Sequence, residues 1–215
     1  MCNKRVILLL SLFLVGPAVY AQQGWGTTKP KENPVFLSAY AETGLSISSY
    51  HTTDEGMNPN LSSVAGFNIG AGVNMRFVKR DERSSIEDGL LGIQAGFLYT
   101  NSGFKTGDEK VSGGYLCIPV DFQFYPIPGL FIEAGPELCM SFGFTPETVN
   151  VQDMSLNISG HKANDLKFAV GAGYIFNVFP AGIHIKYLFG TSDFAENLPW
   201  KGNQLRISLF YRLGF

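Results

Sequence analysis

Charged side chains and long apolar runs are both scarce in this sequence. Asp, Glu, Lys and Arg make up 16% of the 215 residues, and the formal net charge is −2. A chain without a basic excess has no electrostatic attraction to a phosphate backbone, so nucleic acid is not an expected partner. Beyond the first 21 residues there is no stretch of 18 consecutive apolar residues. The sequence therefore predicts no transmembrane helix in the mature chain.

The first 21 residues have the organisation of a secretory signal peptide. Lys4 and Arg5 form a basic start, residues 6–15 are apolar, and the small residues of "AVYA" (18–21) precede the expected cut. A membrane anchor is the alternative, but the apolar run is too short to span a bilayer as a helix. We therefore predict that residues 1–21 are a signal peptide, 22–34 a flexible leader and 35–215 one domain.

Glycine and phenylalanine are abundant, with 25 and 18 residues, which favours an all-β chain with tight turns. Apolar residues alternate with small or polar ones in segments such as "GYLCIPVDFQFYP" (113–125). The sequence contains eight such segments, and single-chain outer-membrane barrels have an even number of strands. A tilted strand of about ten residues rises about 25 Å, which is the height of the apolar band of such barrels. The sequence therefore predicts an all-β fold, an eight-stranded antiparallel up-and-down transmembrane β-barrel of the outer-membrane type. The eight segments are 37–47, 65–77, 91–100, 113–125, 131–142, 167–177, 182–190 and 204–215.

The links between these segments alternate in length. Long polar links are expected at 48–62, 101–112, 145–165 and 190–203. Shorter links are expected at 79–88, 126–129 and 178–181. A barrel in the outer membrane carries long external loops at one end and short periplasmic turns at the other, so this order agrees with the predicted fold.

The alternation alone does not say which face of the sheet points inward. A soluble lipocalin-like barrel is the alternative, with an apolar interior and a wet outside. An eight-stranded barrel is only just wide enough for side chains to fill, and the mixed face here carries the small glycines. The other face is large and apolar in every segment, and as a soluble surface it would exceed what a monomer tolerates. We therefore predict a narrow polar lumen and an outer face in contact with outer-membrane lipid.

Charges of both signs on the mixed face predict a charge network in the lumen. We expect Arg76, Arg206 and Arg212 each to contact an inward acid, because an unpaired buried charge is very costly. A cation path along the acids is the alternative, but basic residues in similar number favour a plug of paired charges. The predicted members are Glu42, Arg76, Asp121, Glu133, Glu137, Lys167, Lys186, Arg206 and Arg212.

Two cysteines lie on the fourth and fifth segments. If Tyr125 pairs with Phe131, counting back along both strands places Cys117 opposite Cys139. Directly opposed residues have Cβ atoms about 4.5–5.5 Å apart, slightly farther than a disulfide prefers, and an oxidising periplasm permits the bond. The alternatives are two free thiols, or a register shifted by a bulge or local break at Pro119, which lacks a ladder donor.

Two stretches of the sequence resemble segments of known outer-membrane proteins. "YLCIPVDFQFYP" (115–126) resembles a strand of the Bacteroidetes outer-membrane β-barrel family that includes the PorT-like proteins. The ending "LRISLFYRLGF" (205–215) resembles the signal by which the barrel-assembly machinery recognises its substrates, with Tyr211, Leu213 and Phe215 as the signal residues. The resemblance implies an outer-membrane location and the assembly machinery as a partner. It implies no single activity, and roles in protein secretion belong to particular members of the family.

Catalytic and cofactor-binding patterns are weak. His184 points inward by parity, away from lipid, and His51 and His161 fall in expected loops beside ordinary hydroxyls and acids. No histidine–cysteine group has zinc spacing, and "GFNIGAG" (66–72) lacks the following helix of a phosphate loop. We therefore expect no enzyme activity, no cofactor and no metal.

The predicted function is that of a small integral outer-membrane barrel with a filled polar lumen. Its role is structural, or it binds a protein partner or surface ligand through the external loops, chiefly 145–165. The alternative is transport, as a narrow channel or a component of a secretion apparatus. A lipid-modifying outer-membrane enzyme is a distant third.

Overall fold

The computed structural model describes residues 35–52, 61–77, 91–107, 109–146, 148–151, 154–157, 164–176, 179–194 and 200–214. The predicted signal peptide (1–21), the leader (22–34) and Phe215 lie outside these residues. Among the described residues, no helix is long and apolar enough to cross a membrane.

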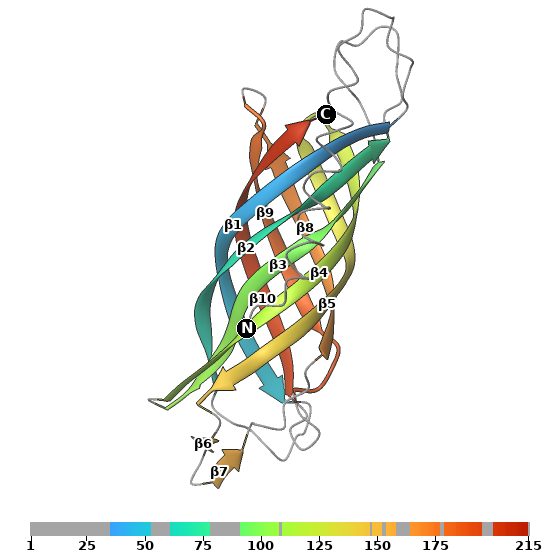
Figure 1. Ribbon diagram of the computed structural model, residues 1–215. Coiled ribbons are helices and arrows are strands. Elements are labelled where there is room, and N and C mark those ends of the chain that lie inside the picture. Colours follow the sequence, from blue (N-terminus) through green and yellow to red (C-terminus); the bar gives the residue numbers. More distant parts are fainter. Residues whose placement is uncertain are drawn as a thin grey trace, which may run out of the picture. The chain divides into compact units, whose positions relative to one another are not determined.

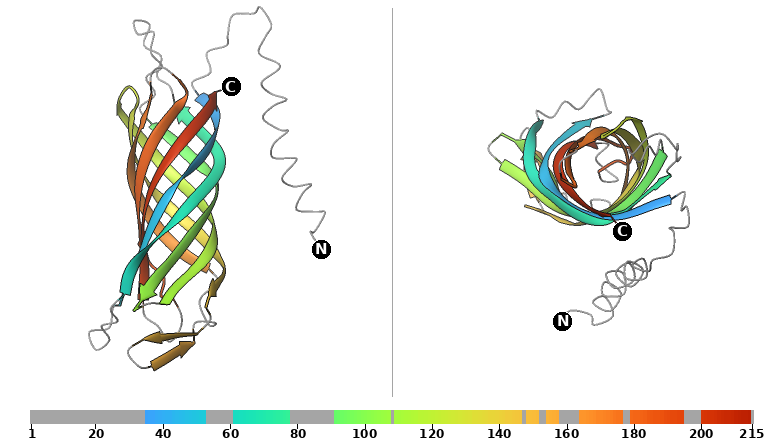
Figure 2. Two further views of the ribbon diagram at one scale, coloured as in Figure 1. Left: turned by 90° about the vertical axis from the view of Figure 1, so that its left-hand side faces the viewer. Right: turned by 90° about the horizontal axis from the view of Figure 1, so that it is seen from above.

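Eight antiparallel strands close into a barrel (Figure 1). Each strand pairs with the next along the chain, and the last pairs with the first, which completes the ring seen end-on in Figure 2. The predicted up-and-down topology of eight strands is therefore confirmed. The strands are β1 (Val35–Thr52), β2 (Leu61–Phe77), β3 (Leu91–Thr106), β4 (Glu109–Ile127), β5 (Leu130–Thr145), β8 (Asn164–Ile175), β9 (Ala181–Gly190) and β10 (Trp200–Gly214).

Several strands continue beyond the predicted apolar segments. The link expected at 101–112 is instead a hairpin, since β3 runs to Thr106 and β4 begins at Glu109 around Gly107, which has a φ of 55°. Alternation persists there, with Phe104 and Thr106 buried, but polar residues replace the apolar ones outside. Because of that change, the sequence pattern predicted a loop where the strands continue. The link expected at 145–165 likewise holds the two-stranded hairpin of β6 (Thr148–Val151) and β7 (Met154–Asn157).

The two ends of the barrel differ. We call the end with the β3–β4 hairpin and the β6–β7 hairpin the loop end, and the opposite end, with the β4–β5 turn, the short-turn end (Figure 1). The β4–β5 turn closes at Gly129, whose φ of 83° lies in the left-handed region that favours glycine.

The outer surface of the barrel is apolar, which excludes the lipocalin-like alternative. Large apolar side chains are exposed along every strand; we call this surface the apolar belt. Phe142 is 69% exposed and Leu45 66%, whereas polar side chains fill the inside. The buried polar and charged residues include Glu42, Asn68, Asn74, Gln94, Asp121, Gln123, Glu133, Glu137, Lys167, His184, Lys186, Gln204, Arg206 and Arg212.

Glycines on the inward face make room for a large neighbour. Gly72 on β2 lies directly opposite Gly96 on β3. A Cβ at Gly96 would lie 2.6 Å from the hydroxyl oxygen of Tyr40, and one at Gly72 would lie 2.8 Å from its ring. The two glycines therefore give buried Tyr40 its space in the narrow lumen.

Pro119 interrupts the ladder without shifting it. It lies opposite Glu137, in the same register as the pairs before and after it. On its other side, the pairs of β3 with β4 pass from Ala95–Val120 to Leu98–Cys117 and leave Pro119 unpaired. The expected local break is therefore present, because proline has no N–H to donate, and no bulge forms at this position.

Candidate functional site

The lumen is filled by side chains in successive layers, and these layers are the candidate site. Aromatic residues and arginines lie at the short-turn end, charged groups lie in the middle, and a second aromatic group lies at the loop end. The layers draw on all eight strands, since every strand places alternate residues inward.

The middle layer centres on His184 of β9. Its Nε2 lies 2.7 Å from Glu42 Oε2 on β1, and its Nδ1 lies 3.0 Å from Glu133 Oε1 on β5. The Nδ1 contact is a hydrogen bond whose donor depends on the tautomer of the ring, and the ring lies between two buried carboxylates. Sequence reasoning placed His184 in the lumen but did not count it in the charge network.

Lys186, two residues along β9, completes this layer. Its Nζ lies 2.6 Å from Asp121 Oδ2 and 3.4 Å from Glu133 Oε1. All five side chains are buried, so the acids face His184 and Lys186 rather than water. We call this group the central cluster: Glu42, Asp121, Glu133, His184 and Lys186.

Gln123 connects the central cluster to the short-turn end. Its Nε2 donates to Glu133 Oε2 at 2.9 Å, and its Oε1 accepts from Asn74 at 2.7 Å and from the Tyr125 hydroxyl at 2.6 Å. Arg212 donates to that same hydroxyl at 3.1 Å. A glutamine can donate and accept together, so one neutral side chain links the two layers.

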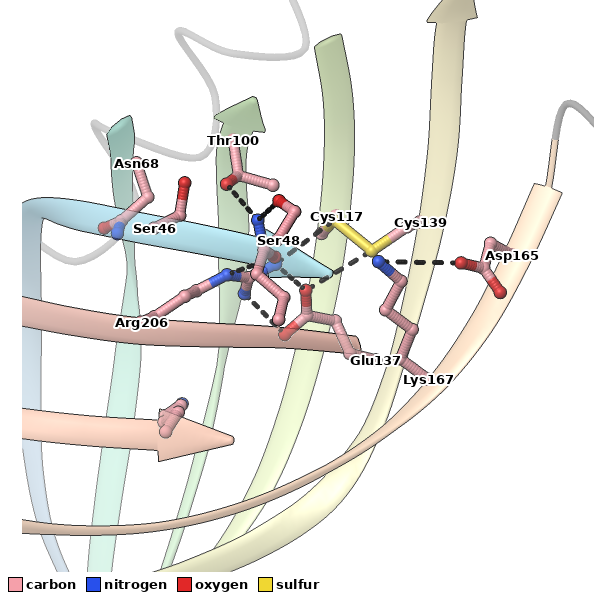
Figure 3. Close-up of polar contacts among 12 residues, drawn as sticks. Ser46, Ser48, Asn68, Thr100, Cys117, Glu137, Cys139, Asp165, Lys167 and Arg206 are labelled. Atoms are coloured by element: carbon pink, nitrogen blue, oxygen red, sulfur yellow. Dashed lines mark hydrogen bonds and ion pairs between the residues drawn. A yellow bond between two sulfur atoms is a disulfide. The ribbon is translucent and has the colours of Figure 1, made fainter. Parts of the chain in front are cut away.

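Arg206 and Glu137 form a two-point ion pair between the central cluster and the loop end (Figure 3). Arg206 Nη2 lies 2.7 Å from Glu137 Oε1, and Nη1 donates to Oε2 at 2.9 Å. Arg206 Nε also donates to Gln204 at 2.9 Å. The pair joins β10 to β5 across the lumen, and both side chains are buried.

A disulfide between Cys117 and Cys139 lies beside this ion pair (Figure 3). The two cysteines are opposed in the β4–β5 register, with Cα atoms 4.0 Å apart. Within the described part of the chain, they form with Glu137 the group whose atoms have metal-ligand spacing, within 4.8 Å. A metal takes cysteine as a thiolate, so the bonded pair is no ligand set, and a metal-free lumen stays our prediction.

Other members of the predicted network have different surroundings. Lys167 lies 3.6 Å from Asp165, which the prediction did not include, and 5.2 Å from the centre of the Tyr115 ring. Arg76 lies over the Tyr125 ring at 4.0 Å. The expectation that Arg212 contacts an inward acid is wrong for the described residues. Its partners are neutral, because Tyr125, Gln94 and Gln123 fill the space around it.

The loop end of the lumen is closed by rings that sequence reasoning missed. Phe104 and Trp200 meet edge to face at 5.5 Å, and Phe144 and Phe194 at 4.9 Å. Three of these rings fell in expected loops, and for Phe104 and Trp200 the signal that could have placed them is the alternation that continues along β3 and β10. We call this group the loop-end cluster: Tyr50, Phe104, Tyr115, Phe144, Phe194 and Trp200.

The remaining predicted residues lie outside the lumen or outside the described ranges. Tyr211 and Leu213 of the proposed assembly signal point outward, 48% and 54% exposed. His51 is exposed near the end of β1. His161 and Phe215 fall outside the described residues.

Comparisons with known proteins find similarity in fold. No protein-family model and no curated protein matches the chain. Ail of Yersinia pestis, solved with the heparin analogue sucrose octasulfate, is 15% identical with a TM-score of 0.44, over 82% of this chain and 99% of Ail. Neisserial surface protein A is 11% identical with a TM-score of 0.45, over 84% and 98%.

The outer membrane protein OprG of Pseudomonas aeruginosa is 12% identical with a TM-score of 0.36, over 82% of this chain and 95% of OprG. At these identities the likeness assigns no ligand or activity to this chain. The resemblance of residues 115–126 to the PorT-like family stays a prediction.

Proposed function

We propose that the protein is a small integral outer-membrane barrel with a closed lumen, which acts structurally or binds a partner or surface ligand at its loop end. The observation that carries the proposal is the filled lumen. The Arg206–Glu137 pair and the central cluster occupy its middle, and the loop-end cluster fills the lumen at the loop end. Buried ion pairs with two-point geometry resist opening, because separating them leaves uncompensated charge.

The apolar belt supports the location. A continuous apolar outside around a polar inside is what a barrel needs in lipid, where each backbone group must be paired within the sheet. The barrel-assembly machinery is the partner that this location implies. Membership of the PorT-like family and a part in secretion form the finer version of the proposal, and a pull-down from cross-linked outer membranes tests it.

Planar-bilayer conductance tests the closed lumen. We expect the purified barrel to insert without measurable ion current, because ion pairs and rings would have to move before a path opened. Glu137→Ala is the informative variant, since it removes one side of the cross-lumen pair and should give rare, short openings. Steady conductance of the unmodified protein would refute the proposal. It would favour the alternative of a narrow cation channel, for which the three carboxylates of the central cluster are the relevant groups.

A further inference from the structure

The outward faces of the described strands carry charge only at the loop end, and that charge is basic. The side chains concerned are Lys105 on β3, Lys110 on β4 and Lys201 on β10. No acid on the described strands shares this outward face. Glu109 is the nearest along the chain, and it lies opposite buried Thr106, in the inward set of positions. The outside of the barrel therefore passes from an uncharged apolar belt to a basic rim.

Two of these lysines oppose each other directly. Lys105 pairs with Lys110 in the β3–β4 register, and both are exposed. Opposed residues have Cβ atoms about 4.5–5.5 Å apart, and like charges in such positions repel each other. Exposed Ser62 on β2 lies opposite Lys105 on its other side. We call these three residues the basic row. An anion that contacts both ammonium groups would remove their repulsion.

The height of the basic row above the apolar belt selects the anion. The last apolar outward pair on these strands is Tyr99 and Leu116, and the Tyr99 ring packs on Phe67 at 5.7 Å, as aromatic residues do at a membrane interface. Lys105 lies six residues beyond Tyr99, about 15 Å higher on a tilted strand. Phospholipid headgroups extend only about 5–7 Å beyond the hydrocarbon. A phosphate carried on the sugars of a glycolipid reaches higher.

We propose that the basic row binds a phosphate group on the core sugars of outer-leaflet lipopolysaccharide. The assignment rests on the proposed outer-membrane location and names a ligand for the loop end. Two ammonium groups match the charge of a phosphate dianion, and lysine binds phosphate as a point charge. The Ser62 hydroxyl donates a further hydrogen bond. Acyl chains of the same molecule would lie against the apolar belt below.

Native mass spectrometry counts the lipid that stays bound to the barrel. The protein comprising residues 22–215, released from phosphatidylcholine nanodiscs that contain rough-type lipopolysaccharide, should retain this lipid. It should retain much less of the same lipopolysaccharide after dephosphorylation. It should also retain less lipid A, which has phosphates but no core sugars. Lys105→Gln and Lys110→Gln should each weaken retention about fivefold, since one cation near an anionic surface contributes about that factor.

Two variants are controls for charge. Lys201→Gln makes the same charge change at the same end, outside the basic row, and should weaken retention less than twofold. Lys105→Arg combined with Lys110→Arg keeps both charges and should retain the lipid.

Three outcomes would overturn the proposal. Unchanged retention by the double glutamine variant would leave an acidic protein as the occupant of this surface. Equal losses for Lys105→Gln and Lys201→Gln would show a dependence on net charge alone. Equal retention of lipid A and lipopolysaccharide would exclude the core sugars. Fractionation of the protein tests its location separately, so a failure of the location is distinguishable from a failure of the basic row.

Discussion

Arg206 and Glu137 meet across the lumen from strands that are not neighbours in the sheet. Neither residue has water to replace its partner, since they are 3% and 1% exposed. A buried pair of this kind adds little to stability compared with an apolar pair of the same size. Removing one member is costly, because the other charge remains buried.

We therefore expect Glu137→Ala to lower the free energy of unfolding by about 3–5 kcal/mol. Urea-induced unfolding in lipid vesicles measures the change. The matched control is Glu137→Ala combined with Arg206→Ala, which should lose less than the single variant because no charge is stranded. Equal stability of the single variant and the unmodified protein would mean that water reaches Arg206 and that the lumen is wet.

Parity along each strand was enough to predict which residues point into the lumen, because side chains alternate with a period of two. Parity was not enough to predict contacts. His184 reaches Glu42 across β10, and Arg212 meets Tyr125 rather than an acid. Such contacts depend on the stagger between strands and on how far each side chain reaches across the lumen. Neither can be deduced from the alternation within a single segment.

At the scale of elements, the β4–β5 hairpin carries the disulfide. Counting back from its turn predicted the register at Cys117 and Cys139, because a short turn leaves few alternatives. The ends of β3 and β4 were harder to predict. Beyond the apolar belt the outward residues become polar, so the pattern of a strand in water resembles that of a loop.

The disulfide gives a direct chemical expectation. In denatured, unreduced protein comprising residues 22–215, neither cysteine should react with a maleimide, and after reduction both should react. Intact mass spectrometry counts the added groups. Cys117→Ser is the control, since it frees Cys139 for reaction without reductant. Full labelling of both thiols before reduction would contradict the bond.

At the scale of the whole molecule, the apolar belt and the closed sheet should keep the barrel folded in detergent. We expect the protein to fractionate with the outer membrane and, unheated, to migrate differently in detergent gels from a boiled sample, because a barrel with no free edge keeps its compact form. Recovery from the soluble periplasmic fraction would contradict the proposed location.

A charged substitution in the apolar belt tests whether this surface contacts lipid. Phe97 is 53% exposed at the middle of β3, opposite Ala71. Phe97→Arg should cost about 2–4 kcal/mol, as arginine does at the bilayer midplane of such barrels, and should reduce the heat-sensitive form on the gel. Lys105→Arg, at the loop end of the same strand, should leave it unchanged.

The seam between β1 and β10 joins the first and last strands of the barrel, from Ser38–Gly214 to Thr52–Trp200. This seam can form only after β10 has been synthesised and exported. His184 and Arg206 come from late strands, and their partners Glu42 and Glu137 from earlier ones. A sheet that is still open would present these charges, and two unpaired edges, to lipid. Pairing of these charges and closure of the barrel should therefore occur in one cooperative step. A truncated chain that lacks β10 should remain a substrate for periplasmic chaperones and proteases.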